Sequence, residues 1–221
     1  MTKTKRYIDK AISPINHARI TAGYKNPSYE KEMGFRHYGT DMTDRNRKDL
    51  KIYAPCPIKI IDCGFDPLMG GSIIAVSVNE VDVHYGPKKG ARRLAFRLAH
   101  LDKIHVKKGQ IIGPEGAPIG LYGGTGRYGG GNAARHLHIE VSTDVKYPAY
   151  SPALKGSSTI WKAGKTDATI NPMDVFKIDR NGDLGLKQTF GYRGASGSWI
   201  LAGDKQTVDL DGKVIDASRW V

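Results

Sequence analysis

The chain is divided into short strand-like segments, and no stretch of it shows the 3.6-residue apolar repeat of a long helix. These segments are rich in β-branched or aromatic residues, and Gly, Pro or Asp bounds each of them, as is typical of strands separated by turns. The 27 glycines among 221 residues fit this interpretation, because turns use residues that tolerate unusual backbone angles. The sequence therefore predicts a mainly β fold, and the segments that carry the prediction are residues 58–62, 72–78, 93–101, 109–113 and 136–141.

The length of the chain suits one domain with a small appendage. We interpret residues 1–17 as an N-terminal arm and residues 18–176 as the main domain. Residues 177–221 are expected to form a small C-terminal β extension, because they contain their own hairpin turn signals.

Four segments of the main domain depart from the strand pattern. Residues 123–135 are Gly-rich and residues 142–170 are mixed in composition, so both are expected to be long loops. Residues 79–92 are expected to be an insertion or a long hairpin. A short helix is predicted at 171–176, where Asn171 can cap the first turn and a proline follows it.

The two cysteines, Cys56 and Cys63, are too few for a disulfide framework, and their spacing does not suit a zinc ribbon. We expect two thiols in or near the core, and a disulfide between them stays open for an oxidising compartment. No apolar run approaches the length of a transmembrane span. The basic N-terminal stretch lacks an apolar segment, so we expect no secretory signal.

Positive charge is concentrated in the middle of the chain. The formal net charge is +12, and residues 88–135 hold ten Lys and Arg against two acidic residues, a net of +8. Such a segment can be a solvated face, a nucleic-acid surface or a surface that attracts another anionic partner. Interleaved aromatic residues are sparse and no nucleic-acid-binding motif is present, so we expect no specific nucleic acid partner.

The histidines form two motifs with metal-ligand character. His37 and Asp41 are four residues apart, and His136 and His138 are two apart. On a strand, residues two apart point to the same face, so His136, His138 and Glu140 should share one face and the intervening apolar residues the other. Zinc binds neutral imidazoles and carboxylates, and a catalytic site keeps one position for water. Each motif alone is weak, since a single histidine is more often solvated or hydrogen-bonded in a core.

The order of the motifs along the chain is more specific than any one of them. It runs from ARITAGYKNPSYEKEMGFRHYGTDM through LAHLDKIHVKKGQIIGPEGAPIGLYGGTG and RHLHIEV to NPMDVF. This order resembles the lysostaphin/LytM-type zinc endopeptidases of peptidoglycan. In that family an H-x-G-x-D segment precedes A-H-L, then V-x-x-G-Q and I-G-x-x-G-x-T-G, then H-L-H-F-E and N-P. The resemblance covers roughly residues 18–176, which would be the zinc peptidase domain.

The resemblance implies a fold and a set of residue roles. The fold would be an antiparallel β-sheet core with long loops. His37, Asp41 and His138 would be the ligands of zinc (Zn2+), and His100 and His136 would be the two catalytic histidines. One imidazole can take a proton from water and deliver it to the leaving amine, and the other can donate to the oxyanion. The sequence does not assign these two roles.

The activity implied is zinc-dependent endopeptidase cleavage of the stems and cross-bridges of bacterial peptidoglycan. From the charge and the lack of a signal segment we expect a phage lysis enzyme, an antimicrobial endolysin. It would be a monomer, made in the host cytoplasm, that acts at the cell wall after release and is attracted by the anionic cell envelope. Two alternatives stay open: a non-catalytic member of the same fold that binds the wall or regulates an amidase, and a basic nucleic-acid-binding protein.

Some residues and loops lie outside the shared motifs. Glu140 is expected either to orient a histidine or to be solvated. His84 and His105 are expected to be surface residues. The segment between Thr125 and His136 is longer than usual for the family, so one wall of the cleft should be remodelled, and the pentaglycine specificity of lysostaphin is not carried over.

Overall fold

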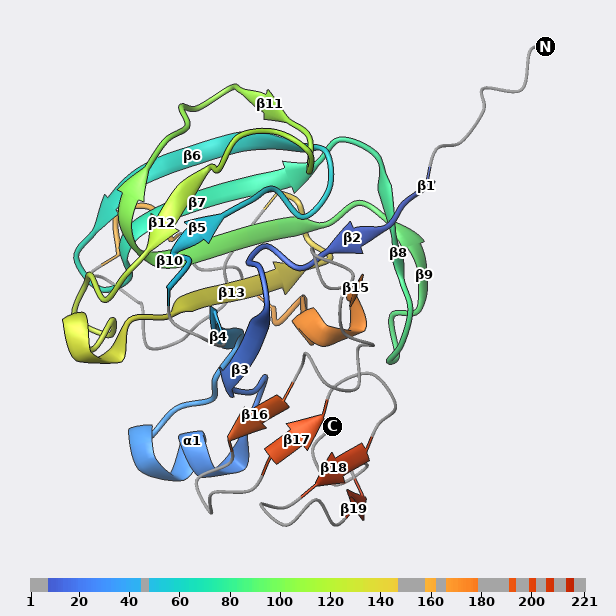
Figure 1. Cartoon of the computed structure of the whole chain (residues 1–221). Helices are drawn as coiled ribbons and strands as arrows, with labels where there is room; N and C mark the ends of the chain where they lie inside the picture. Colours follow the sequence, from blue (N-terminus) through green and yellow to red (C-terminus); the bar gives the residue numbers. More distant parts are fainter. Residues whose placement is uncertain are drawn as a thin grey trace.

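The computed structural model describes residues 8–44, 48–146, 158–161 and 166–178, together with four strands of the C-terminal region. Its main feature is one ten-stranded antiparallel sheet (Figure 1). Seven strands follow the order β11-β6-β7-β10-β13-β4-β3; β12 pairs with β10 and β5, and β14 pairs with β13. The strands are β3 (Ala18–Ala22), β4 (Thr40–Asp44), β5 (Lys51–Ile52), β6 (Ile58–Asp66), β7 (Gly70–Ser77), β10 (Ala95–Ile104), β11 (Ile111–Ile112), β12 (Gly120–Tyr122), β13 (Leu137–Ser142) and β14 (Thr169–Ile170).

The mainly β prediction is confirmed, and each of the five predicted strand segments contains a strand of this sheet. The long β6, β7 and β10 are adjacent; β6 and β7 bury isoleucines such as Ile60 and Ile73, whereas β10 buries Phe96 and Leu98. The 79–92 segment is a hairpin rather than an irregular insertion, since β8 (Glu80–Val83) pairs antiparallel with β9 (Gly90–Arg92).

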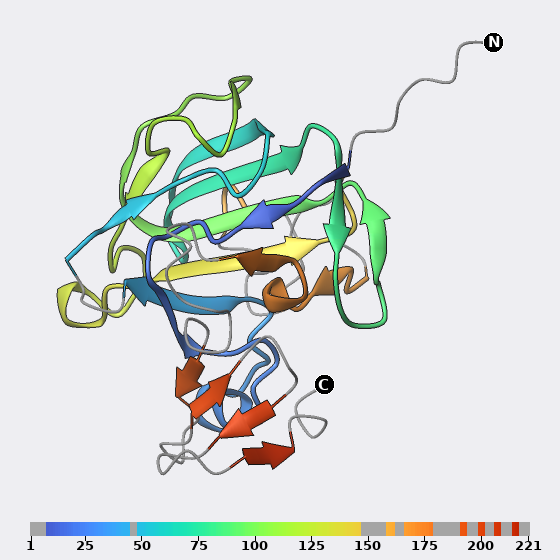
Figure 2. The same ribbon diagram turned by 45° about the vertical axis from the view of Figure 1, so that its right-hand side comes forward.

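Two small sheets, separate from the large one, contain strands from the two ends of the described main body. β1 (Ile8–Asp9) runs parallel to β8, and β2 (Ala11–Ile12) runs parallel to β15 (Phe176–Ile178). In Figure 2 the blue N-terminal strands cross the same side of the molecule as the brown segment that ends in β15. Residues 8–12 therefore pair with the main body.

Four further strands form an antiparallel sheet of their own near the C-terminus, coloured red in Figure 1. The predicted hairpin turns that would join them lie outside the described residues. The strands are β16 (Gly191–Arg193), β17 (Trp199–Leu201), β18 (Gln206–Val208) and β19 (Val214–Asp216).

Helices are short and few among the described residues. The predicted helix at 171–176 is a single 3-10 turn, η3 (Pro172–Asp174), and the side chain of Asn171 accepts the N–H of Met173 as expected of an N-cap. A second 3-10 turn, η1 (Asn132–Ala134), lies in the Gly-rich loop. The helix α1 (Pro27–Met33) was not predicted, because seven residues are too few to show a helical repeat. None of the helices in these residues is long and apolar enough to cross a membrane.

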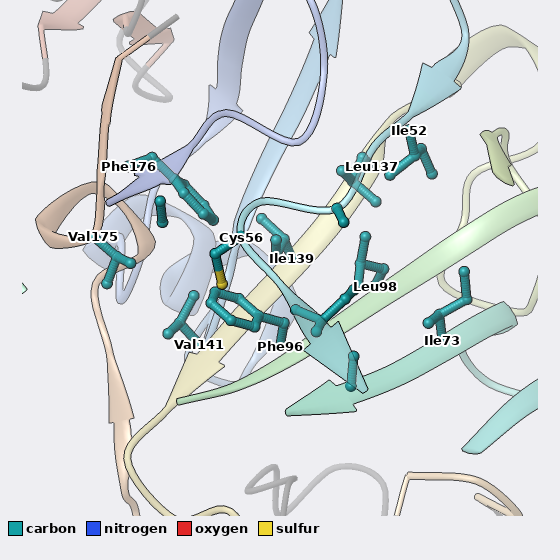
Figure 3. Packing of buried hydrophobic residues seen from close by; sticks show 14 of the residues in the cluster. Ile52, Cys56, Ile73, Phe96, Leu98, Leu137, Ile139, Val141, Val175 and Phe176 are labelled. Atoms are coloured by element: carbon teal, nitrogen blue, oxygen red, sulfur yellow. The ribbon is translucent and has the colours of Figure 1, made fainter. Parts of the chain in front are cut away.

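The main hydrophobic core packs on one face of the large sheet. Leu137, Ile139 and Val141 of β13 alternate into it, as the sequence predicts, and each is fully buried. Figure 3 shows Phe96 and Phe176 in this core, where their rings stack with centroids 6.4 Å apart.

The opposite face of the sheet carries a smaller apolar cluster, formed by Leu68, Met69, Ile74, Ala99 and Trp161. Trp161 comes from the segment 158–161, and its indole N–H donates to Ser72 Oγ at 2.9 Å. This cluster supports the face of β10 and β13 on which the histidines lie.

Both cysteines are free thiols. Cys56 is buried in the main core and Cys63 is half-buried, which agrees with the predicted thiols in or near the core. Burial raises the pKa of the Cys56 thiol above its ordinary value.

Candidate metal centre and active site

Three side chains that are far apart in the sequence meet at one point. The Nε2 atom of His37 lies 3.1 Å from Asp41 Oδ1 and 3.0 Å from His138 Nδ1, and His138 Nδ1 lies 2.8 Å from Asp41 Oδ1. All three residues are buried. The structure thus brings together the three residues that the sequence predicts as metal ligands.

Strand pairing positions two of these ligands. β4 and β13 are antiparallel neighbours, and Asp41 lies directly opposite His138 in their register. Gly39 makes this approach feasible, because a Cβ at that position would come within 2.7 Å of the His138 ring. The H-Y-G-T-D segment therefore needs its glycine for packing against the second histidine.

The third ligand is oriented by a backbone carbonyl. His37 Nδ1 donates to the Gly23 carbonyl at 2.8 Å, which leaves the lone pair of Nε2 facing Asp41 and His138. Tyr29 of α1 stacks on the same imidazole, with ring centroids 4.5 Å apart. The ring of His37 is therefore fixed from two sides.

The donor set fits zinc. Zinc accepts imidazole nitrogen and carboxylate oxygen at about 2.0–2.1 Å in a tetrahedron, which puts ligand atoms about 3.3 Å apart. The observed separations of 2.8–3.1 Å among His37, Asp41 and His138 are slightly shorter and need only a small outward shift. Two nitrogens and one oxygen leave a fourth position for water or substrate.

The two predicted catalytic histidines lie next to this group. The rings of His100 and His136 have centroids 4.8 Å apart, and His136 Nε2 lies 3.7 Å from Asp41 Oδ2. His136 Nδ1 donates to the Ala134 carbonyl and His100 Nδ1 to the Thr125 carbonyl, at 2.6 and 3.0 Å. Each imidazole therefore presents an unprotonated Nε2 when it is neutral.

His100 lies on an irregularity of β10. The pairing of β10 with β7 shifts register between Leu98 and Leu101, and His100 has a φ of +64° in the left-handed region. Its N–H donates to the Met69 carbonyl, and its carbonyl accepts the N–H of Gly123, both at 2.8 Å. The bulge turns the His100 side chain toward the metal-ligand group.

Burial and mutual charge shift the pKa values of the site in opposite directions. Burial and the neighbouring imidazoles of His136 and His138 lower the pKa of His100 to about 3. For His138, burial lowers the pKa, but contacts with Asp41 and Glu140 outweigh burial and raise the pKa to about 9. His37, His136 and His138 hold the pKa of Asp41 well below its usual value, against the effect of burial. His100 is consequently a neutral imidazole at physiological pH.

An aromatic pocket opens beside the metal-ligand group. Phe35 makes edge contacts with both Tyr29 and Tyr128, with ring centroids 5.8 and 5.7 Å apart. These three rings and Met69 line the pocket together with His37 and His100. The pocket was not predictable from the sequence because its residues share no motif. The one local signal was the Asn26-Pro27 pair, which begins α1 as Asn171-Pro172 begins η3.

Three other expectations are decided by burial. Glu140 is only 2% exposed and pairs with Arg97, so the solvated alternative is wrong. His105 is exposed, as predicted. His84 is buried, which contradicts its prediction as a surface residue: its N–H donates to the Asp174 carbonyl at 2.8 Å, and its ring lies 3.0 Å from Asp82. The η3 turn, remote in sequence, covers it.

Comparisons with known proteins identify the fold. No protein-family profile and no curated protein matches the chain. Among solved structures, lysostaphin, the antimicrobial peptidase from Staphylococcus simulans, aligns at 18% identity over 87% of this chain and 65% of its own, with a TM-score of 0.52. A chain of the SpoIIQ–SpoIIIAH pore-forming complex aligns at 15% identity over 77% and 92%, with a TM-score of 0.51. A zinc-containing peptidase from Vibrio cholerae shows 30% identity over 60% of this chain and 37% of its own, with a TM-score of 0.42.

The chain therefore has the fold of the lysostaphin-type peptidases, as the sequence resemblance implies. It spans just under two thirds of the lysostaphin chain. Because a peptidase and a component of a pore-forming complex share the fold at this level of similarity, fold alone does not assign an activity.

Proposed function

We propose that the chain is a zinc-dependent endopeptidase that hydrolyses peptide cross-links of bacterial peptidoglycan. The observation that carries the proposal is the convergence of His37, Asp41 and His138 on one point, with two further imidazoles beside it. A scaffold or binding protein of the same fold has no need of this complete set. We assign the metal-ligand role to these three residues and the catalytic role to His100 and His136.

The chain's own groups account for binding the metal and handling the proton. His37 Nε2, Asp41 Oδ1 and His138 Nδ1 would hold the zinc ion. A zinc ion supplies Lewis acidity, which polarises a peptide carbonyl and activates water for attack. His136 Nε2 is placed to take a proton and return it to the leaving amine, because Nδ1 donates to the Ala134 carbonyl and the Nε2 lone pair remains as the acceptor.

His100 would have a different role from His136. Its pKa near 3 makes it a weak base at neutral pH. Its Nε2 is an acceptor while Nδ1 donates to the Thr125 carbonyl, so it can orient a water molecule or a substrate N–H. We therefore propose His136 as the proton carrier and His100 as the orienting group.

The aromatic pocket supports a peptide substrate. Tyr29, Phe35 and Tyr128 form apolar walls of one pocket with His37, and Tyr29 stacks directly on the His37 imidazole. A stem or cross-bridge peptide lying along these rings would present its carbonyl to the metal centre. The cell wall is then the place of action, and the basic segment 88–135 would favour approach to an anionic envelope.

Release by a phage during lysis is a further part of the proposal, and the basic charge of the chain supports it. The test is to make the protein in the cytoplasm of intact cells and to observe whether they lyse only after the inner membrane has been permeabilised. Lysis of untreated cells at the same rate would contradict this context and leave the endopeptidase activity standing.

The decisive experiment is digestion of purified peptidoglycan from both wall types, with and without a zinc chelator, followed by mass spectrometry of the products. We expect chelator-sensitive solubilisation with release of new peptide amines, and the fragment masses then identify the bond. Zinc bound at about one per chain without amine release would instead indicate a binding or regulatory protein of this fold. Affinity for nucleic acid that falls steeply with salt and ignores the chelator would indicate the nucleic-acid alternative.

A further inference from the structure

A buried ion pair lies on the sheet face beside the metal-ligand group. Arg97 of β10 and Glu140 of β13 are 0% and 2% exposed, and they lie directly opposite each other in the antiparallel register. Arg97 Nη1 donates to Glu140 Oε2 in a short contact. Charged residues are seldom buried to this degree unless they are paired, so the pair needs a reason to be inside.

The reason lies at His138, which is two residues before Glu140 on the same face of β13. The Nδ1 atom of this histidine faces Asp41 and His37, whereas its Nε2 atom is buried and has no hydrogen-bond partner among the described residues. The carboxylate oxygen Oε1 of Glu140 lies 3.6 Å from that Nε2. Trp161 packs on the ring from the covering segment, with centroids 6.0 Å apart, and helps to keep water away.

Only one tautomer of a neutral His138 satisfies both of its nitrogens. A metal needs the lone pair of Nδ1, so the single ring proton must lie on Nε2. A buried N–H without an acceptor is costly, and a carboxylate facing it is the acceptor available. The opposite tautomer would point the Nε2 lone pair at the negative charge of Glu140 and place a proton where the metal binds.

We propose that Glu140 is a positioning residue for the metal centre: it accepts the Nε2–H of His138 and so reserves Nδ1 for the metal, while Arg97 balances the buried negative charge. This inference rests on the proposed zinc site. It assigns no contact with substrate to either residue. The 3.6 Å separation shortens to a hydrogen bond through a small movement of the carboxylate once the imidazole is held by the metal.

The role of Arg97 is separable from that of Glu140. Removing one member of a buried ion pair leaves the other charge unpaired, and that loss alone can unfold a protein. Replacing both by neutral residues of similar size is often tolerated. The test therefore uses two double variants that both lack the charges and differ only in the acceptor at position 140.

The variants are Arg97→Met with Glu140→Gln, and Arg97→Met with Glu140→Met. The glutamine keeps an oxygen that can accept the Nε2–H, whereas methionine of similar length offers no comparable acceptor. We expect the Gln variant to bind zinc within a few-fold of the unmodified chain. The Met variant should bind zinc about 10–100-fold more weakly, the usual effect of losing such a partner. Competition with a chromophoric chelator measures both affinities, and metal-free thermal unfolding verifies that both variants fold.

The outcomes separate this inference from the proposed function. Equal zinc affinity in the two double variants, with the unmodified chain binding zinc, overturns the role of Glu140 and leaves the metal site intact. Failure of the unmodified chain to bind zinc overturns both proposals.

A second measurement needs no variant. Long-range nitrogen–proton correlation spectra of the zinc-loaded chain should show His138 protonated at Nε2. Protonation at Nδ1 with Nε2 deprotonated would overturn both the assignment of Nδ1 to the metal and that of the Nε2–H to Glu140.

Discussion

At the scale of single residues, His136 just before β13 and His138 within it have different expected roles. His138 Nδ1 lies in the metal-ligand group, whereas His136 approaches it only through Asp41. We expect His138→Ala to lose zinc and hydrolysis together, and His136→Ala to keep zinc and lose most of the hydrolysis, by about 10²–10⁴-fold as is usual for an acid–base group. Metal content per chain and amine release from peptidoglycan measure the two properties. If both variants bind zinc normally and remain active, the assignment is wrong.

The left-handed backbone conformation of His100 should reverse the usual order of stability of alanine and glycine at this position. Glycine normally destabilises a strand by about 0.5–1 kcal/mol relative to alanine. At a φ of +64° the order should reverse, because alanine meets a steric cost there of about 1–2 kcal/mol that glycine avoids. We expect His100→Gly to unfold at higher denaturant concentration than His100→Ala, with both inactive and both able to bind zinc. A more stable alanine variant would contradict a strained bulge at this position.

The residues of the candidate site were predictable to the extent that they repeat a linear pattern. The five motif residues could be found because H-x-x-x-D, A-H-L and H-x-H each lie within a few positions. Arg97 could not, because its role depends on the register that puts it opposite Glu140. His84 failed for a related reason: the turn that buries it comes 90 positions later in the chain.

At the scale of elements, one carboxylate ties the covering segment 158–161 to the sheet. Asp66 ends β6, and its Oδ1 accepts the N–H groups of Leu68 and Met69 at 2.9 and 3.0 Å. Its Oδ2 accepts the Ser158 hydroxyl and the N–H groups of Thr159 and Ile160, at 2.7, 2.9 and 3.1 Å. The position of Trp161 beside His138 therefore depends on a residue that is distant from the motifs.

Substituting that carboxylate should loosen the segment. Asp66→Asn places an amide where three donors converge, and we expect a loss of about 1–3 kcal/mol in the free energy of unfolding. The matched control is Asp62→Asn on the same strand. Among the described residues its carboxylate accepts only the N–H of Cys63, so this substitution should change stability little. Chemical denaturation of the three chains measures the differences. Equal stability of the two variants would contradict a stabilising role for the hydrogen bonds between Asp66 and the segment 158–161.

The same contact predicts a pH dependence. Burial opposes ionisation of Asp66, but hydrogen bonds from Ser158 and from three backbone N–H groups outweigh it and lower the pKa below the usual 3.8. A folded-state pKa below the unfolded one stabilises the folded chain fully above the unfolded value and loses that effect as pH falls through the folded value. The difference between the unmodified chain and Asp66→Asn should be constant above about pH 5 and shrink below about pH 4. A difference that grows on acidification would contradict the sign.

Elements were predictable where alternation or caps are local. The strand 136–141 alternates cleanly, and its apolar half lies in the core as expected. The cap of η3 was recognised from Asn171 and the proline that follows. The helix α1 begins with a similar Asn-Pro pair, yet its function in the pocket depends on how Tyr29 stacks on His37, which no local pattern specifies.

At the scale of the whole molecule, the two faces of the large sheet have different roles, one in stability and the other in the candidate site. One face carries the larger core, and the other carries the histidines over a smaller apolar cluster. The strands β10 and β13 contribute to both, since Leu98 and Ile139 point into the core while Ala99 and His138 point to the site. A change in their register by one residue would exchange the two sets, so packing of the core also fixes the geometry of the site.

This division makes the extent of the folding unit testable. The sequence places the main domain at residues 18–176, but Ala11 and Ile15 of the preceding arm are fully buried, and β2 pairs with β15 up to Ile178. A fragment of residues 8–178 should therefore unfold cooperatively and bind zinc as the full chain does.

The fragment 18–176 loses two strand pairings and the burial of Ile15, each large against a total stability of about 5–15 kcal/mol. We expect its melting temperature to fall by 10 °C or more, since about 1 kcal/mol shifts a domain of this size by about 2–4 °C. Calorimetry of the two fragments decides the boundary: equal melting temperatures would show that residues 8–17 are an appended arm, as the sequence alone suggests.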